Sequence, residues 1–387
     1  MQADRACYVA RPADDELFDC IAEQRFAYVL SPRATGKSSL MAHTIRRLRQ
    51  EGQLAAVIDL TQIGARGESA DAGRWYYGIA YRIVRELRLK VDLQSWWQEK
   101  SSLLGDQRLV EFFWEIVLTN TTAPVTIFFD EAERAAGLSF GDELFSAIRS
   151  CYQLRISEPD YARLNFVVLG VATPKQLSKD PSASPFIDGQ AIELPDFALT
   201  QCYELGKGFG LDPTVSRALI ERIYQWTSGH PYLTQKIARG VARKGGKLAD
   251  VERVVQEQFF AAAAIQEEPL LSQIRVMFAE PTPQTRLALN GLIRIAKQGE
   301  RYKEPGPAAR ELLALAGIVS TDSMGRLRFR NEIFARVFNE RWASSELPVN
   351  WQRSVLVAAS IAAVAVLSFW YTQILPRPYI NTLSVVT

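Results

Sequence analysis

The sequence predicts an α/β fold, in which a parallel β-sheet carries helices on both faces and helical domains follow it. Short apolar runs alternate with helical stretches through the first half of the chain, as expected for parallel strands joined by crossover helices. After Phe197 the strands stop and helical spacing dominates through about Arg275. Residues 36–38, Gly-Lys-Ser, stand where one of these strands joins a helix.

Composition sets wide bounds on function. A chain of 387 residues predicts two or three domains. The net charge of +2 provides no strong field toward nucleic acid, which we expect not to be a partner. The four cysteines are scattered, and with two histidines a structural zinc site is not expected. The first residues contain no apolar core, which excludes a secretory signal.

The strongest local signal is a strand, a tight loop and a helix between residues 26 and 48. Residues 26–30 form an apolar run, and Leu40, Ile45 and Leu48 recur at helical spacing. A helix start that follows such a loop presents free N–H groups and a positive dipole end to phosphate. Ser31 stands where the usual GxxxxGK[ST] pattern has glycine, so the loop is a variant that requires a negative φ at this serine.

This loop predicts a phosphate-binding site. We expect Lys37 to reach the β- and γ-phosphates of a nucleotide and the Ser38 hydroxyl to ligate Mg²⁺. The loop residues expected to contact the nucleotide are Ser31, Pro32, Arg33, Ala34, Thr35, Gly36, Lys37, Ser38 and Ser39.

A second run, 125–129, ends in two adjacent carboxylates, Asp130 and Glu131. Ligands of parallel sheets bind beyond the carboxyl ends of the strands. Asp130 would hold Mg²⁺ through water, and Glu131 would orient or deprotonate the attacking water. The alternative is that these acids only cap the next helix.

Other elements follow the same pattern. Strands are expected over 55–60 and 166–169, with an edge strand at 191–194 and a helix over 142–155. Aromatic-rich segments at 75–79 and 96–99 are expected to pack in a core, because no basic stripe surrounds them. Any of Arg134, Arg149 and Arg155 could face a neighbouring subunit as an arginine finger, although a solvated helix face explains them as well.

The C-terminal third has a different pattern. Residues 276–345 predict helix, helix, β-hairpin and helix, the order of a winged helix, with Gly325 at the turn. Its arginines would suit DNA, but alternation of arginine with apolar residues also fits a half-solvated strand.

An uncharged stretch, Ser354–Leu375, is long enough to cross a bilayer as a helix, with Arg353 and Arg377 at its ends. We therefore expect a single-pass protein of the inner membrane with its nucleotide domain in the cytoplasm. The expected domains are 1–195 (nucleotide), 196–275 (helical lid), 276–345 (winged helix), 346–353 (linker), 354–375 (membrane helix) and 376–387 (tail).

Longer motifs carry a resemblance. The chain resembles the bacterial AAA-like family of STAND (signal-transduction) P-loop ATPases over about 6–345. The motifs are YVARPAD (8–14), YVLSPRATGKSSLM (28–41), IDLTQIG (58–64), IFFDEAE (127–133), LGVATP (169–174), SPFIDGQAIEL (184–194), WTSGHPYLTQK (226–236) and RNEIFARVFNERW (330–342). Two departures are DEAER in place of the more usual DEID, and Ser31.

The resemblance implies further roles. Arg11 would lie near the adenine base, Pro231 would pack on it as part of a lid, and Thr173 would sense the γ-phosphate. His230 is expected to be a turn or packing residue.

The resemblance also implies a membrane-tethered switch that binds ATP and Mg²⁺, hydrolyses ATP slowly, and forms a homo-oligomer or recruits an effector protein. The winged helix would pack on the nucleotide domain and hold the inactive state. The family often carries a WD-repeat sensor, which these residues do not contain. The alternatives are a DNA-binding ATPase acting through the winged helix and a nucleotide-binding scaffold that does not hydrolyse.

Overall fold

The computed structural model describes residues 8–64, 71–298, 306–347 and 351–373. Its first part is a five-stranded parallel sheet with strand order β2-β3-β4-β1-β5. The strands are β1 Ala27–Leu30, β2 Leu54–Asp59, β3 Val125–Asp130, β4 Leu164–Gly170 and β5 Gln190–Ala191. The predicted parallel sheet is therefore confirmed, but the edge strand, predicted over 191–194, is limited to residues 190–191.

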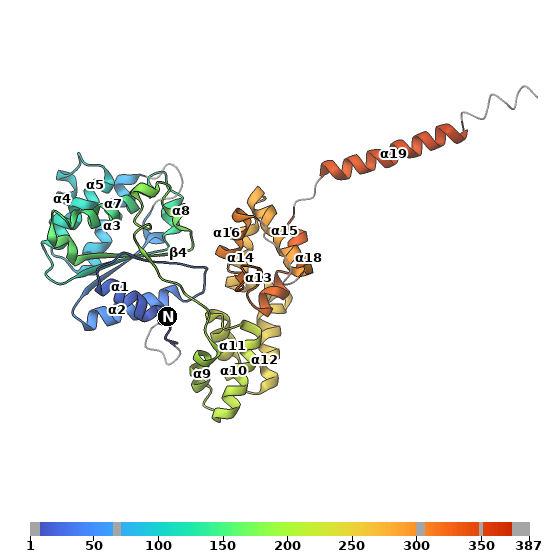
Figure 1. Ribbon diagram of the computed structural model, residues 1–387, viewed down its shortest axis with the longest axis horizontal. Coiled ribbons are helices and arrows are strands. Elements are labelled where there is room, and N and C mark those ends of the chain that lie inside the picture. Colours follow the sequence, from blue (N-terminus) through green and yellow to red (C-terminus); the bar gives the residue numbers. More distant parts are fainter. Residues whose placement is uncertain (1–7, 65–70, 299–305, 348–350, 374–387) are drawn as a thin grey trace, which may run out of the picture.

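Helices cover both faces of this sheet (Figure 1). One face packs against α1 Pro12–Ala22 and α2 Lys37–Gln50 through a core that includes Leu17, Leu40 and Val29. The opposite face packs against α3 Ala72–Leu87, α4 Leu93–Glu99, α5 Gly105–Phe112 and α7 Gly141–Leu154, with the short helices α6 Glu133–Ala136 and α8 Pro174–Leu177 beside them. The aromatic residues Trp75 and Tyr76 are buried in this second core, as predicted.

The strand order explains how the loop and the acids meet. β4 pairs with β1 on one side and with β3 on the other, all in parallel. The carboxyl ends of β1 and β3 therefore lie at the same edge of the sheet, one strand apart. Strands this fully buried consist of continuous apolar residues, which is why 125–129 and 164–169 contain almost no polar side chain.

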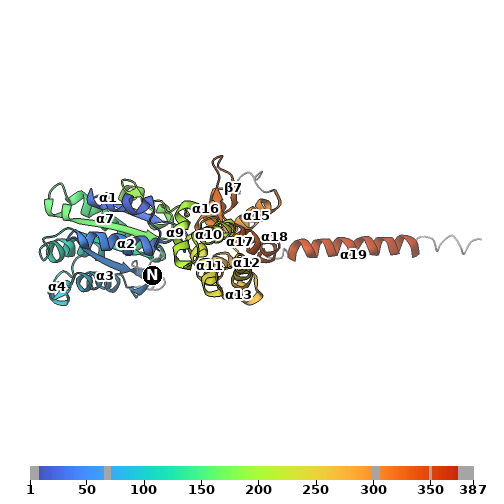
Figure 2. The same cartoon turned by 90° about the horizontal axis from the view of Figure 1, so that it is seen from below.

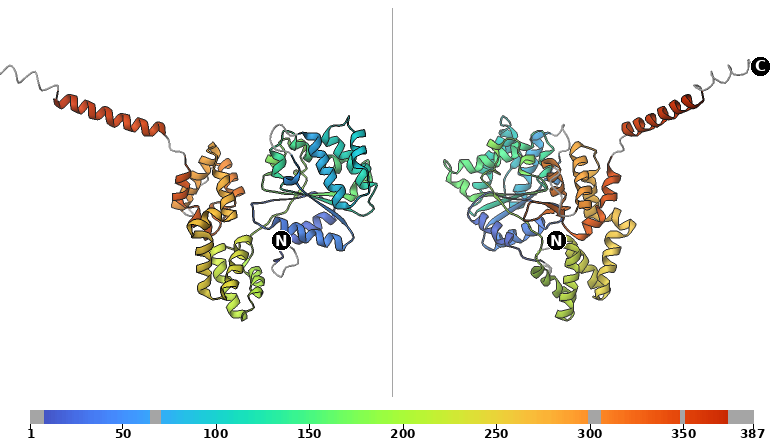
Figure 3. Two further views of the ribbon diagram at one scale, coloured as in Figure 1. Left: turned by 180° about the vertical axis from the view of Figure 1, so that it is seen from behind. Right: turned by 45° about the vertical axis from the view of Figure 1, so that its right-hand side comes forward.

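Helices dominate the rest of the chain. The helices after the sheet are α9 Leu199–Gly206, α10 Pro213–Thr227, α11 Pro231–Lys244, α12 Leu248–Val255, α13 Ala262–Glu267 and α14 Pro269–Phe278. They share one hydrophobic core with the segment that follows them, because Ile223, Leu271, Leu292 and Phe334 belong to a single cluster. Helices α9 to α14, together with the segment that follows them, form the helical half of the molecule, and β1 to β5 with their covering helices form the sheet domain. Figure 3 shows the two side by side in two further views.

The segment from 283 to 346 contains two helices, an antiparallel strand pair and further helices. Its elements are α15 Pro283–Gln298, α16 Pro307–Ala316, β6 Val319–Thr321, β7 Leu327–Phe329, α17 Glu332–Val337 and α18 Glu340–Glu346. Figure 2 shows the strand pair projecting from the surrounding helices. The identification of this segment as a winged helix stays a prediction.

The structure corrects the prediction of a membrane helix. Helix α19 Trp351–Gln373 leads away from the other helices, and Ile361, Leu367 and Phe369 are exposed on it (Figure 1). Among the residues that the structure describes, no helix is both long and apolar enough to cross a membrane. A crossing helix needs roughly 20 consecutive apolar residues.

The prediction of a span at 354–375 is therefore wrong, and the predicted location at the inner membrane, which depended on it, is wrong too. Residues 374–375 and the predicted tail, 376–387, lie outside the described residues.

Candidate nucleotide site

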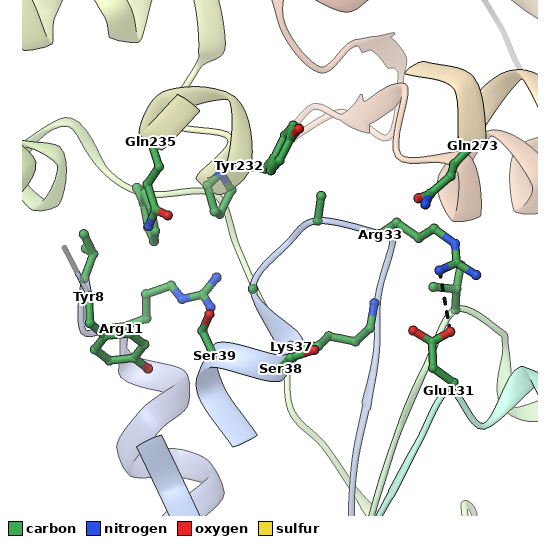
Figure 4. Close-up of a pocket in the computed structure, with 16 residues that line it drawn as sticks. Tyr8, Arg11, Arg33, Lys37, Ser38, Ser39, Glu131, Tyr232, Gln235 and Gln273 are labelled. Carbon is green, nitrogen blue, oxygen red and sulfur yellow. Dashed lines mark ion pairs between the residues drawn. The ribbon is translucent and has the colours of Figure 1, made fainter. Parts of the chain in front are cut away.

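A cavity of about 350 Å³ lies where the loop after β1 faces helices α11 and α14 (Figure 4). Its floor comes from the loop, the start of α2 and the residue after β3, and its roof comes from the two helices. The lining residues are Tyr8, Val9, Arg11, Arg33, Ala34, Gly36, Lys37, Ser38, Ser39, Glu131, Val171, Phe197, Pro231, Tyr232, Gln235 and Gln273. Most of the loop predicted to contact a nucleotide therefore faces one cavity.

The loop is held by its own polar side chains. Ser31 Oγ and Thr35 Oγ1 are 2.9 Å apart, and the Thr35 hydroxyl donates to Pro32 O at 2.9 Å. Ser31 N donates to Gly170 O at 3.1 Å, which ties the loop to β4. Ser31 is not among the residues with positive φ, so serine replaces the usual glycine without strain.

Gly36 is the loop position that requires glycine. Its φ of 101° lies in the left-handed region, and a Cβ there would stand 2.7 Å from Arg11 Nη2. A side chain at position 36 would therefore collide with a guanidinium that lines the same cavity.

Lys37 is buried at the first turn of α2. Its Nζ donates to Ser31 O at 2.7 Å and to Pro32 O at 2.9 Å. Burial lowers the pKa of Lys37 to about 8, although the negative charges of Glu133, Glu131 and Asp130 oppose the change. A lysine in this position keeps its ammonium beside the cavity and within the field of the acids after β3.

The acids after β3 lie close to one loop arginine. Arg33 is 3.5 Å from Glu131 and 3.3 Å from Glu133. Burial, followed by a side-chain hydrogen bond with Glu133, raises the pKa of Glu131 to about 7. Glu131 also has a φ of 55°, a conformation that is costly for a residue with a side chain and concentrates at functional sites.

Asp130 is half-buried at the end of β3, and its carboxylate accepts the Glu131 N–H at 2.9 Å. Burial raises the pKa of Asp130, and the charge of Lys37 opposes that rise. Lys37 and Asp130 are thus electrostatic neighbours. Ser38 is exposed at the start of α2 and lines the cavity, whereas Asp130 is not among the lining residues. A hydroxyl and a carboxylate are both oxygen ligands that suit Mg²⁺.

Arg11 is more deeply embedded than the sequence suggested. Its guanidinium donates to Thr35 O at 2.9 Å and to Pro195 O at 3.4 Å, and it lies 5.4 Å from the centre of the Phe197 ring. Arg11 therefore links the loop to the connection into α9 while it lines the cavity. Pro231 also lines the cavity, as the first residue of α11.

His230, predicted to be a turn or packing residue, is buried as the N-cap of α11 and contacts the ring of Phe334.

Thr173 is not among the lining residues. It follows β4, and its hydroxyl donates to Glu311 Oε1 of α16 at 3.0 Å. Two further contacts bring the C-terminal segment against the loop and against the connection into α9. Arg330 forms a two-pronged pair with Asp196 at 2.7 and 2.6 Å. Gly317, with a φ of 70°, approaches the loop so closely that a Cβ would stand 2.7 Å from Pro32 Cβ.

Two of the candidate finger arginines are engaged inside the chain. Arg155 donates to the carbonyls of Gln24 and Leu164, both at 2.6 Å. Arg149 donates to Ser184 O at 2.7 Å and pairs with Asp188 at 3.0 Å. A structural role accounts for both residues.

Sequence reasoning missed several residues of the site. Glu133 could have been found, since it stands three positions after Asp130 in the quoted acidic motif. Tyr232 and Gln235 could also have been found, because they lie in the quoted motif at 226–236 beside Pro231. Gln273 and Glu311 come from helices farther along the chain, and no local pattern marks them, because only folding brings α14 and α16 to the loop.

The chain is similar to known proteins in sequence and in fold. The chain is 33% identical over 366 residues to an uncharacterized WD repeat-containing protein of Synechocystis sp., in a match that covers 90% of this chain and 30% of that protein. The chain thus spans less than a third of its relative's length.

Two solved structures share the fold. One is the Walker-type ATPase PABY2304 of Pyrococcus abyssi, with a TM-score of 0.56 and 17% identity over 87% of this chain and 99% of the other. The second is the Aeropyrum pernix ORC2 protein, with a TM-score of 0.53 and 11% identity over 86% of this chain and 91% of the other. These likenesses show a P-loop NTPase-like α/β fold. The AAA-like domain family matches residues 1–338, and the chain belongs to this family.

Proposed function

We propose that this protein is an ATP-dependent molecular switch that hydrolyses ATP slowly. The observation that carries the proposal is the shared cavity, in which the loop lysine, the acid after β3 and the helices α11 and α14 meet. A site between a sheet edge and a separate helical half can report the state of its ligand as a change in their relative position.

In this proposal each part of the site would have its own task. The apolar end, with Val9, Phe197 and Pro231, would receive the base, and Lys37 would receive the phosphates. Ser38 and Asp130 would hold Mg²⁺, which when bound neutralises phosphate charge. Glu131, whose pKa of about 7 allows it to accept a proton near neutral pH, would orient or deprotonate the attacking water.

The contacts of the C-terminal segment support a closed, inactive arrangement. Glu311 engages Thr173, Gly317 lies on Pro32, and Arg330 is paired with Asp196. A nucleotide can change this arrangement only by binding two arrangements with different affinity. Thr173, freed from Glu311, would be able to reach the γ-phosphate.

The family resemblance supports the finer part of the proposal. A STAND-type switch would use the C-terminal segment as a winged helix that holds the inactive state. Release of that segment would expose surfaces for self-association or for an effector protein in signalling or defence.

Two substitutions test the proposed function. Lys37→Ala should abolish binding of ATP and ADP, measured by titration with fluorescent nucleotides, because it removes the cation that faces the phosphates. Glu131→Gln should keep ATP binding and stop phosphate release, because the base is lost and the shape is kept. Thermal unfolding checks that both variants fold. A wild-type chain that binds neither nucleotide would refute the proposal.

The alternatives predict different results. A scaffold that does not hydrolyse would bind ATP and release no phosphate in the wild type. A DNA-binding ATPase would show a salt-dependent gel shift. Two of the three arginines around the strand pair do not favour it, because Arg326 pairs with Asp322 and Arg330 with Asp196, whereas Arg328 is exposed.

A further inference from the structure

Gln273 enters the cavity from the helical half. It lies on α14, and Figure 4 shows its side-chain amide directed toward Arg33, at the end of the cavity where Glu131 lies. Tyr8 and Gln235 lie at the opposite end in the same view. Because Lys37 stands between the two ends, Gln273 is placed at the end where the terminal phosphate of a bound triphosphate would lie.

Three other side-chain donors of the site already have partners. Lys37 donates to two loop carbonyls, Arg33 pairs with Glu131 and Glu133, and the Thr173 hydroxyl donates to Glu311. Gln273, by contrast, is exposed and makes no side-chain hydrogen bond to another residue that the structure describes. Its amide is thus available to donate to a ligand that enters the cavity.

A buried ion network holds the helix that carries Gln273. Glu268, 3% exposed, caps α14 by accepting Leu271 N at 2.8 Å. The same carboxylate accepts Tyr232 Oη at 2.7 Å and Lys236 Nζ at 2.9 Å from α11. Helices α11 and α14 are therefore tied together, and Gln273 has a fixed relation to Pro231 and Tyr232, which line the same cavity.

We propose that Gln273 is a specificity-determining residue that recognises the terminal phosphate and so lets the helical half distinguish ATP from ADP. An amide donates a hydrogen bond to a phosphate oxygen without adding a charge beside Glu131 and Arg33. The inference rests on the proposed nucleotide-binding function. It goes beyond that function by naming the residue that distinguishes a triphosphate from a diphosphate.

The test compares the affinities of the full chain for a non-hydrolysable ATP analogue and for ADP, both with Mg²⁺. Gln273→Ala should weaken the analogue about ten-fold, the size expected when a hydrogen bond to a charged group is lost. Gln273→Glu should weaken it further by repulsion, and ADP should stay within about two-fold for both. Val276→Ala is the control, since Val276 is exposed on the same helix and does not line the cavity.

The outcomes separate the two proposals. An unchanged ratio of the two affinities, or an equal loss for both nucleotides, would overturn the role of Gln273 while leaving nucleotide binding intact. A wild-type chain that binds neither nucleotide would overturn the proposed function, and the role of Gln273 with it.

Discussion

The hydroxyl of Thr173 donates a hydrogen bond to Glu311 Oε1 at 3.0 Å, across 138 positions of sequence. Thr173 follows the central strand β4, and Glu311 lies on α16 of the C-terminal segment. A threonine hydroxyl has a single proton to donate. It can therefore serve Glu311 or a phosphate oxygen, and not both at once.

Removing Glu311 should shift the preference toward ATP. With Glu311→Ala, Thr173 is freed and the negative charge beside it is lost. We expect the affinity for a non-hydrolysable ATP analogue, relative to ADP, to rise about five-fold, within the worth of one hydrogen bond to a charged group. Glu332→Ala removes an exposed carboxylate paired with Arg336 and should have no effect. An unchanged ratio in the Glu311 variant would show that this contact is not part of the switch.

Gly317 allows the C-terminal segment to approach the loop. Alanine at this position would suffer the cost of positive φ, roughly 1–2 kcal/mol, and would also collide with Pro32. Gly325→Ala is the matched control, because its φ of 78° is similar and nothing lies within 4 Å of a Cβ there. Chemical denaturation should show Gly317→Ala to be about 1–3 kcal/mol less stable than the control, the usual cost of overpacking. Equal losses would mean that the close approach to Pro32 contributes nothing.

Arg330 and Asp196 form a largely buried pair, with side chains 10% and 22% exposed. Arg330→Ala should lower the free energy of unfolding by about 3 kcal/mol, because it leaves the Asp196 carboxylate without its partner. Arg328→Ala, two residues earlier on β7, removes an exposed side chain whose hydrogen bond to Ser320 Oγ is 3.4 Å long. It should change stability by less than about 0.5 kcal/mol. Similar losses in the two variants would contradict the importance of the buried pair.

The pH dependence of hydrolysis should be a narrow bell. Glu131 must be deprotonated to act as a base, so kcat/KM should fall as the pH drops below its pKa of about 7. Lys37 must be protonated to bind phosphate, so kcat/KM should also fall as the pH rises above about 8. The profile of kcat/KM reports the free enzyme, to which these values apply. In the Glu131→Gln variant, the affinity for the ATP analogue should fall only on the alkaline side, where Lys37 loses its proton.

Arg33→Ala should move this profile to higher pH. The positive charge of Arg33 lowers the pKa of Glu131 and also that of Lys37. Without it both pKa values rise, so the acidic and the alkaline limb of kcat/KM should shift in the same direction. Measuring the two limbs in the variant tests this, and a shift of the acidic limb alone would show that Arg33 does not act on Lys37.

Local sequence determined the sheet domain and half of the site. The apolar runs of β1, β3 and β4 predict buried parallel strands, and the residues that follow β1 and β3 then meet at one edge, because parallel strands end on the same side. The roles expected of Lys37 and Glu131 follow from their positions directly after these strands, and both residues line the cavity. The wrong prediction at 354–375 depended on the length of an uncharged stretch and on the arginines at its ends, whereas no described helix is both long and apolar enough to cross a membrane.

Tertiary structure alone decided what faces the loop. Gln273 and Glu311 stand more than 140 positions after Glu131 in the chain, and no spacing rule connects them to it. The shared core of the helical half, together with the Arg330–Asp196 pair, brings α14 and α16 to the sheet edge. Long-range packing of this kind depends on complementary shape and buried charge across separate elements, and a pattern read along the chain contains neither.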